Sequence, residues 1–182
     1  MNVRTLPLLA LLALGASSTV SAQMPAATEV PAGQLAQSDV DFLQNANSSN
    51  VTQVAMAHTA ETGAVKPGVR SLATRIARSH TKADQALRLL ASRKHVDLPR
   101  TANASDNSEI SELHTHKKGG DFDSQYVKNV IADHDRMIQM YEAARDGSTD
   151  ADIRRYADTM LPALKENRQQ ANAMVNKQVG AH

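Results

Sequence analysis

Two histidines, His80 and His134, stand where a side chain could do chemistry inside a helical core. Each lies at the middle of an apolar stripe with helical spacing. The stripes read Val69, Leu72, Ile76, His80, Ala83, Leu87 and Leu90, and Phe122, Tyr126, Val130, His134, Met137 and Tyr141. A polar, titratable group in such a stripe needs a partner. Whether that partner is a metal ion, a bound molecule or another side chain decides whether the chain has a chemistry of its own.

The sequence does not support a di-iron centre at these histidines. Such a centre needs a Glu from each of two helices and a Glu-x-x-His pair from each of the other two. Ala77 stands three residues before His80, and Ile131 stands three residues before His134. With no Glu-x-x-His in the predicted helices, ferroxidase or oxidase chemistry is not expected.

Three simpler arrangements remain open, one of which is a pocket for a small ligand at these residues. In the first, Asn50, His80, His134 and Asn167 form a polar layer that satisfies itself by hydrogen bonds and holds the helices in register. In the second, His80 and His134 bind a metal with Asp84, one turn along the same helix, as a third ligand. Zinc or copper accept two imidazoles and a carboxylate.

Other catalytic signatures are missing from the chain. There is no cysteine, no G-x-S-x-G segment and no Gly-rich phosphate loop. His114 and His116 stand in a polar connection, where we expect solvated side chains. We therefore predict no catalytic residues and no cofactor, and zinc, copper or iron are the metals that a site at the two histidines would hold.

Four long helices must position these residues. Helical periodicity and breakers predict them over residues 38–63, 69–94, 122–145 and 150–176, with Ser38 as the first cap. Short links join the first two and the last two. A long polar connection, with a short helix over 108–117, joins the second to the third. This all-α pattern predicts a ferritin-like four-helix bundle of two antiparallel hairpins and a long crossover.

The first residues have the pattern of a secretory signal. Arg4 gives a positive start, residues 6–16 are apolar, and small residues precede a cleavage site between Ala22 and Gln23. An uncleaved membrane anchor is the alternative, but the apolar run is shorter than the roughly 20 residues that span a bilayer. We predict a signal peptide over 1–22, a flexible linker over 23–37, the bundle over 38–177 and a tail over 178–182.

Composition narrows the classes of partner. Cleavage would remove Arg4 and no acidic residue, which leaves 19 basic and 19 acidic side chains. A nucleic-acid partner is not expected, because such proteins show a clustered basic face. No mature segment is apolar enough for a transmembrane span, although association with a membrane surface stays open.

Several short segments together resemble the exported bacterial proteins of the domain of unknown function 4142 family. They are Asp41-Phe42-Leu43, Ser79-His80, Val96-Asp97-Leu98-Pro99, the run from Gly120 to Tyr126, Asp133-His134 and Leu161-Pro162. The resemblance covers about residues 38–177 and implies a ferritin-like bundle in the cell envelope, without an established activity. The chain departs from the family pattern at Ser79, Gln53 and Asn167, where the family commonly has Asp, Glu and His. Each departure removes a charge or a ligand.

These observations favour an exported, non-enzymatic bundle that acts as a structural, stress-related or binding module. The partner would be a protein or a small ligand. The periplasm is the expected location, with attachment to the outer membrane or secretion as alternatives. The alternative function is a divergent metal-binding bundle with its site at His80 and His134.

Overall fold

The computed structural model describes residues 35–116 and 119–179, and it describes side chains as far as residue 175. Every regular element in these ranges is a helix. The elements are α1 (Gln37–Gly63), α2 (Pro67–Arg93), α3 (Ala104–Thr115), α4 (Gly120–Gly147) and α5 (Ala151–Val179).

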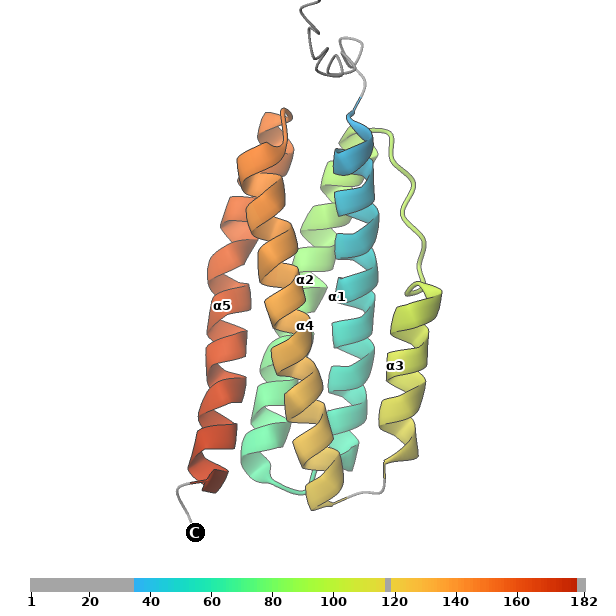
Figure 1. Cartoon of the computed structure of the whole chain (residues 1–182). Helices are drawn as coiled ribbons and strands as arrows, with labels where there is room; N and C mark the ends of the chain where they lie inside the picture. Colours follow the sequence, from blue (N-terminus) through green and yellow to red (C-terminus); the bar gives the residue numbers. More distant parts are fainter. Residues whose placement is uncertain (1–34, 117–118, 180–182) are drawn as a thin grey trace, which may run out of the picture.

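The four long helices form a bundle of two antiparallel hairpins, α1–α2 and α4–α5 (Figure 1). α1 packs on α2 and α4, and α5 packs on α2 and α4, so that α1 and α5 occupy opposite corners. The connection from α2 to α4 returns along the outside of the bundle and includes α3, which lies against α1 and α4 (Figure 1). The predicted ferritin-like arrangement with a long crossover is confirmed.

The helix ends differ from the prediction at two caps. α1 begins at Gln37, its N-cap is Ala36, and no side chain caps it. Ser38 therefore lies in the first turn, so the predicted Ser38 cap was wrong. α3 begins four residues earlier than predicted, because Asn103 accepts a hydrogen bond from the backbone N–H of Asp106 at 2.9 Å. α5 extends to Val179, two residues into the predicted tail.

The buried apolar side chains form two separate clusters along the bundle. We call them the lower cluster, around Met56, Ile76, Phe122 and Tyr126, and the upper cluster, around Phe42, Leu87, Tyr141 and Ile153. Figure 1 shows the α1–α2 turn and the start of α4 at the lower end. His80 and His134 belong to neither cluster and stand between them in sequence on α2 and α4.

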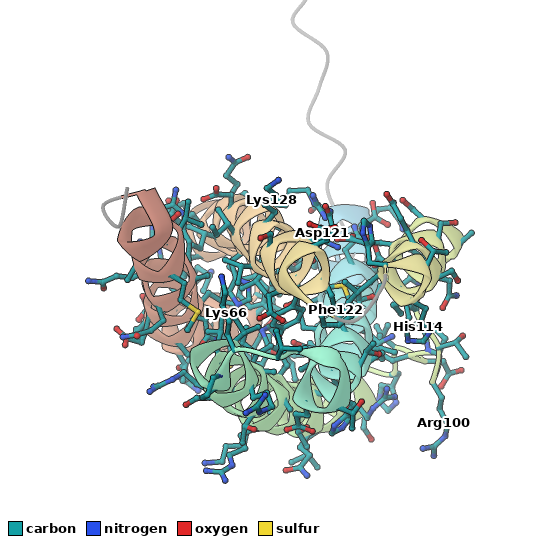
Figure 2. All side chains as sticks on the ribbon, turned by 90° about the horizontal axis from the view of Figure 1, so that it is seen from below. Lys66, Arg100, His114, Asp121, Phe122 and Lys128 are labelled. Atoms are coloured by element: carbon teal, nitrogen blue, oxygen red, sulfur yellow. The ribbon has the colours of Figure 1, made fainter. Side chains whose placement is uncertain are left out.

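The start of α4 joins the two hairpins at the lower end. Phe122 is 2 % exposed and lies inside the bundle (Figure 2), against Gly63. A Cβ on Gly63 would stand 3.0 Å from Phe122 Cζ, so a larger residue there would displace the Phe122 ring by a few tenths of an ångström. The Asp123 carboxylate accepts hydrogen bonds from the backbone N–H groups of Val65 and Lys66 at 3.0 and 2.8 Å. These residues of the Gly120–Tyr126 run therefore hold the α1–α2 turn.

The crossover is fixed at its beginning by a second buried polar contact. Asn47, fully buried on α1, donates from Nδ2 to the carbonyl of Pro99 at 3.0 Å. Arg88 donates to Asn47 Oδ1 at 3.0 Å and to Asp84 at 2.8 Å. Asn47 thus serves the crossover rather than the middle of the bundle.

Part of the predicted organisation lies outside the described residues. These are the signal peptide over 1–22, the cleavage site between Ala22 and Gln23, and most of the linker. Among the described residues, no helix combines the length and the apolar character needed to cross a membrane.

Candidate functional site

The two stripe histidines meet in the middle of the bundle. His80 Nε2 on α2 lies 3.3 Å from His134 Nε2 on α4, and the two ring planes stand at 84°. His80 is 1 % exposed and His134 is completely buried. Asn50 on α1 completes the group, with its Oδ1 2.9 Å from His80 Nδ1. We call these three residues the polar layer.

The protonation of His134 follows from its backbone contact. Its Nδ1 lies 2.8 Å from the carbonyl oxygen of Val130. A carbonyl only accepts, so Nδ1 carries the hydrogen and a neutral ring leaves Nε2 as an acceptor. Burial lowers the pKa of His134 to about 4, against the opposing effects of Val130 and Asp135. Burial and the neighbouring His134 also hold the pKa of His80 well below its usual value. Both rings are therefore neutral at neutral pH.

The orientation of the Asn50 amide decides what lies between the rings. If Asn50 Nδ2 donates to His80 Nδ1, then His80 Nε2–H donates to His134 Nε2 and the layer is a continuous hydrogen-bond chain. If Asn50 presents Oδ1, as in the structure, His80 Nδ1–H donates to it. Both Nε2 lone pairs then face each other, and Asn50 Nδ2 is left without a partner. The second arrangement leaves room for a positive charge between the nitrogens.

The other predicted members of the site do not join the layer. Asn167, 2 % exposed on α5, donates to Ser79 Oγ at 3.4 Å instead of to a histidine ring. Asp84 accepts from Arg88, and so serves the crossover contact. The structure thus brings together Asn50, His80 and His134 and sets Asn167 and Asp84 apart.

The distance between His80 Nε2 and His134 Nε2 suits two ligands of one metal ion, but the surrounding side chains do not complete a metal site. Two nitrogens bound to one tetrahedral zinc would stand about 3.3 Å apart, which matches the pair. Zinc sites in proteins typically have three or four protein ligands. In the part of the chain that the structure describes, no three His, Cys, Asp or Glu side chains form a group suited to a metal.

Three other histidines, His58, His114 and His116, lie away from the polar layer. His58 Nδ1 lies 3.0 Å from Glu61 on the exposed side of α1. His114 Nε2 lies 2.7 Å from Thr59 Oγ1, which ties α3 to α1. His116 is the C-cap of α3, so the His114-x-His116 pair ends that helix.

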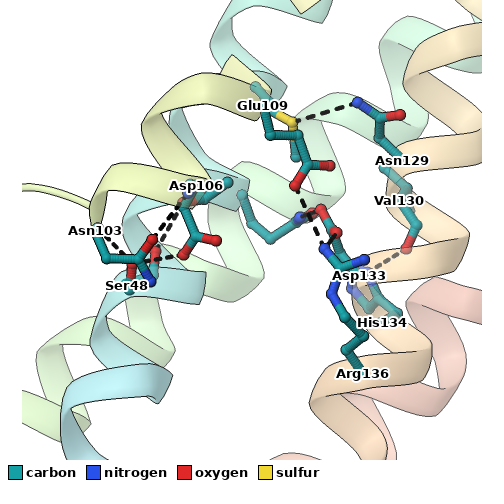
Figure 3. Close-up of polar contacts among 12 residues, drawn as sticks. Ser48, Asn103, Asp106, Glu109, Asn129, Val130, Asp133, His134 and Arg136 are labelled. Carbon is teal, nitrogen blue, oxygen red and sulfur yellow. Dashed lines mark hydrogen bonds and ion pairs between the residues drawn. The ribbon is translucent and has the colours of Figure 1, made fainter. Parts of the chain in front are cut away.

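A second polar group lies beside the layer, at the junction of α1, α3 and α4. Gln53 Nε2 donates to Asp133 Oδ2 at 2.5 Å, and Arg136 pairs with Asp133 and, at 3.4 Å, with Glu109 on α3 (Figure 3). Asp106 on α3 accepts from Ser48 at 2.5 Å. All of these residues except Ser48 border a small pocket of about 80 Å³, which we call the α3 pocket.

Two carboxyl groups of the α3 pocket, those of Asp133 and Glu109, have raised pKa values. Burial, and then the charge of Glu109, raise the pKa of Asp133 to about 7, although Arg136 and Gln53 act in the opposite direction. Burial also raises the pKa of Glu109, against the effect of Arg136. Perturbed carboxyl groups beside a cavity are a common property of binding and catalytic sites.

The α3 pocket was not predicted from the sequence. Asp133 entered the prediction as part of the Asp-His pair, and Gln53 as a departure from the family pattern. The available signal was the polar character of α1, where Ser48, Thr52 and Gln53 are all buried. Such residues indicate a second covered face on the helix.

Comparison with known protein families gives one match for this chain. The model described as "Domain of unknown function (DUF4142)" matches residues 24–174. The chain belongs to this family. A search of curated proteins finds no significant match for this DUF4142 chain.

Two solved structures share the fold of this DUF4142 protein. A DUF305 fragment from Deinococcus radiodurans superposes with a TM-score of 0.70 at 14% identity, over 79% of this chain and 99% of that one. A DUF305 protein from Streptomyces coelicolor, described as secreted, gives a TM-score of 0.65 at 15% identity, over 77% and 91% of the two chains. At such identities the likeness concerns the fold.

Proposed function

We propose that this DUF4142 protein is an exported, non-catalytic helical bundle of the cell envelope that serves as a structural, stress-related or binding module. One observation carries the proposal: the buried histidine pair finds its contacts within the bundle, at Asn50 and Val130. In this function the polar layer sets the relative height of α1, α2 and α4, because a shift of one helix would leave buried polar groups unpaired.

Export is supported by the signal-like N-terminus and by the secreted description of a structural neighbour. Fractionation of the producing bacterium, followed by N-terminal sequencing, tests it. We expect a chain beginning at Gln23 in the periplasmic fraction; an outer-membrane or culture-medium fraction would change the location alone. An intact Met1 on cytoplasmic protein would overturn export.

The structural role of the layer is tested by the tautomer of His80. Long-range ¹H–¹⁵N correlation spectra of the metal-free mature chain distinguish a hydrogen on Nδ1 from one on Nε2. A self-contained layer requires the hydrogen of His80 on Nε2 and that of His134 on Nδ1. A bound redox metal, with turnover that His134→Ala abolishes, would overturn the non-catalytic assignment.

The second candidate function is metal binding, and the facing Nε2 atoms favour it. With hydrogens on both Nδ1 atoms, the layer has two imidazoles oriented by hydrogen bonds to Asn50 and Val130, as histidine ligands commonly are. Zinc, copper or iron would then occupy the space between them, with further ligands from water or a bound molecule. Elemental analysis of protein made without a His-tag, and the melting temperature with each metal, decide between the candidates. A metal-free protein with unchanged melting would exclude this second function.

A further inference from the structure

Charge is distributed unevenly among the helices of this chain. α2 contains six Lys or Arg residues and one acidic residue, Asp84, whereas α1 contains three acidic residues and no Lys or Arg. The whole chain has 20 basic and 19 acidic residues, so the near-balance of the composition conceals a basic helix. Figure 2 shows nitrogen-tipped side chains projecting from α2 into solvent. The outer face of α2 is therefore a region of the bundle that attracts an anionic partner.

Four of these basic residues form one row along the outer face of α2. Arg75, Arg78, Lys82 and Arg93 are all exposed, and at about 100° per residue their positions lie within about 60° of one another around the helix axis. Leu89 is exposed on the same face, and we call the five residues the α2 stripe. At about 1.5 Å per residue the stripe is roughly 27 Å long. A straight row of this length presents all four cations to one flat surface at the same time.

The cations of the α2 stripe face solvent without strong partners in the bundle. Arg88, on another face of α2, pairs with Asp84 at 2.8 Å. Among the side chains that the structure describes, no ion pair involves the four cations of the stripe. Glu61 on α1 is close enough to Arg78 for their charges to interact, but its ion pair is with His58. Most of the positive charge of the stripe is therefore left for an external partner.

An apolar patch lies within the stripe, between Lys82 and Arg93. Leu89 is 66 % exposed, and an open groove of about 270 Å³ lies beside it, between α2 and α5. The other apolar residues that line the groove are Ala86, Leu90, Tyr156 and Met160. A lipid bilayer has an apolar layer directly beneath its charged head groups, whereas the phosphate backbone of a nucleic acid does not. Cations in a row around an exposed apolar side chain therefore favour a lipid surface over a nucleic acid.

We propose that the α2 stripe binds the surface of a membrane that contains anionic phospholipids. The four cations contact lipid phosphates, Leu89 enters the boundary between head groups and acyl chains, and α2 lies parallel to the membrane plane. The inference names a partner for the binding role in the cell envelope, and in that respect it rests on the proposed function. Binding uses exposed side chains alone, so the polar layer keeps its contacts.

Co-sedimentation of the purified mature chain with vesicles tests the proposal. One set of vesicles contains equal parts of phosphatidylglycerol and phosphatidylcholine, and the other contains phosphatidylcholine alone. We expect saturable binding to the anionic vesicles at low salt and at least tenfold weaker binding to the neutral ones. Binding should weaken as the salt concentration rises, because salt screens exposed charges.

Substitutions in the stripe separate its charged and apolar parts. The double variant Arg75→Gln/Lys82→Gln should bind the anionic vesicles at least tenfold more weakly, since each basic side chain near an anionic surface strengthens binding about fivefold. Leu89→Gln keeps the charge of the stripe and removes its exposed apolar side chain. It should bind the same vesicles about fivefold more weakly.

Lys128→Gln/Lys165→Gln is the matched control, because it removes the same number of positive charges away from the stripe. Lys128 is exposed on α4, diagonally across the bundle from α2, and Lys165 on α5 pairs with Glu142 on α4. This variant should bind the anionic vesicles as the unchanged chain does. Circular dichroism confirms that each variant is folded.

Several results would overturn the inference: no binding to the anionic vesicles, equal binding to both sets of vesicles, equal losses in the two double variants, or an unchanged vesicle affinity in Leu89→Gln. Binding to double-stranded DNA as tight as to the anionic vesicles would also overturn it and would assign the stripe to nucleic acid. Each of these outcomes leaves export and the structural role of the polar layer as they stand, because N-terminal sequencing and the His80 tautomer decide those.

Discussion

The polar layer and the α3 pocket are adjacent in sequence and opposite in character. On α4 they use neighbouring residues, His134 and Asp133, and on α1 they use Asn50 and Gln53, which stand one turn apart. The layer consists of groups that are neutral when buried, and each ring has a contact inside the bundle. The pocket consists of ionisable side chains and the Gln53 amide, and each site has one amide atom without a partner, Asn50 Nδ2 in the layer and Gln53 Oε1 beside the pocket.

Burial explains the difference. Inside the four helices, both histidines are neutral, His80 contacts Asn50 and His134 contacts the Val130 carbonyl. At the outer junction, burial raises the pKa of Asp133 to about 7, and Arg136, which reaches the carboxylate from the solvent side, acts in the opposite direction. The comparison indicates that one helix can bear a neutral buried side chain and an ionisable side chain beside a pocket at neighbouring positions, according to which helix covers each face.

The largest expected effect is the loss of stability in His134→Ala. The substitution leaves a cavity and takes away the contact of His80 Nε2, so we expect the free energy of unfolding to fall by about 3 kcal/mol or more. Urea unfolding at pH 7.5 measures it. The exposed His58→Ala should change this value by less than about 0.5 kcal/mol. A loss below about 1 kcal/mol for His134→Ala would show that the polar layer contributes little to the stability of the fold.

Acid should destabilise the protein through the layer. The pKa of His134 is about 4 in the folded chain and about 6.5 when unfolded, so the unfolded chain binds more protons between these values. The contribution is fully present above pH 6.5 and is lost as the pH falls toward 4, by on the order of 3 kcal/mol. Urea unfolding of the wild type and His134→Leu across this range measures the difference. A pH-independent difference would contradict the prediction.

The pocket should respond to pH in the opposite direction. The pKa of Asp133 rises to about 7 on folding, so its protonated form stabilises the fold below pH 4, and this contribution is lost as the pH rises through 7. The free energy of unfolding of Asp133→Asn, relative to that of the wild type, should therefore rise by on the order of 2 kcal/mol between pH 4 and pH 8. Asp135→Asn is the control. An unchanged slope in Asp133→Asn would mean that Asp133 is ionised at little cost.

The smallest effect is expected at Asn167. Its contact with Ser79 is long, at 3.4 Å, so Asn167→Ala should cost about 1 kcal/mol and leave the histidine tautomers unchanged. Asn50→Ala should alter the His80 resonances in the same spectra. A tautomer change in Asn167→Ala would return Asn167 to the layer.

The sequence predicts the parts of this arrangement that depend on one helix at a time. The stripes placed His80 and His134 toward the bundle interior, and short and long links predicted the ferritin-like topology. The position of Asn167 depends on the relative height of α5 and α2, which no pattern within one helix encodes. Gln53 and Asp133 were not identified as a site because α3 covers a second face of α1 and α4, and a search for one stripe per helix does not detect it.

The division of the apolar core into lower and upper clusters has a consequence for local opening. Apolar contacts are concentrated near the two ends, while the middle is joined by hydrogen bonds that depend on alignment. The lower end has an additional clasp in Phe122 and in the Asp123 carboxylate, which accepts two backbone hydrogen bonds. At the upper end, the α4–α5 turn is tied to α2 by partly exposed ion pairs of Lys94 with Asp150 and Asp152, which contribute less to stability. Backbone amides of the upper turns of α4 and α5 should therefore exchange with solvent at a lower free energy than those of the lower end. Local unfolding of the bundle would therefore begin at its upper end and proceed toward the polar layer.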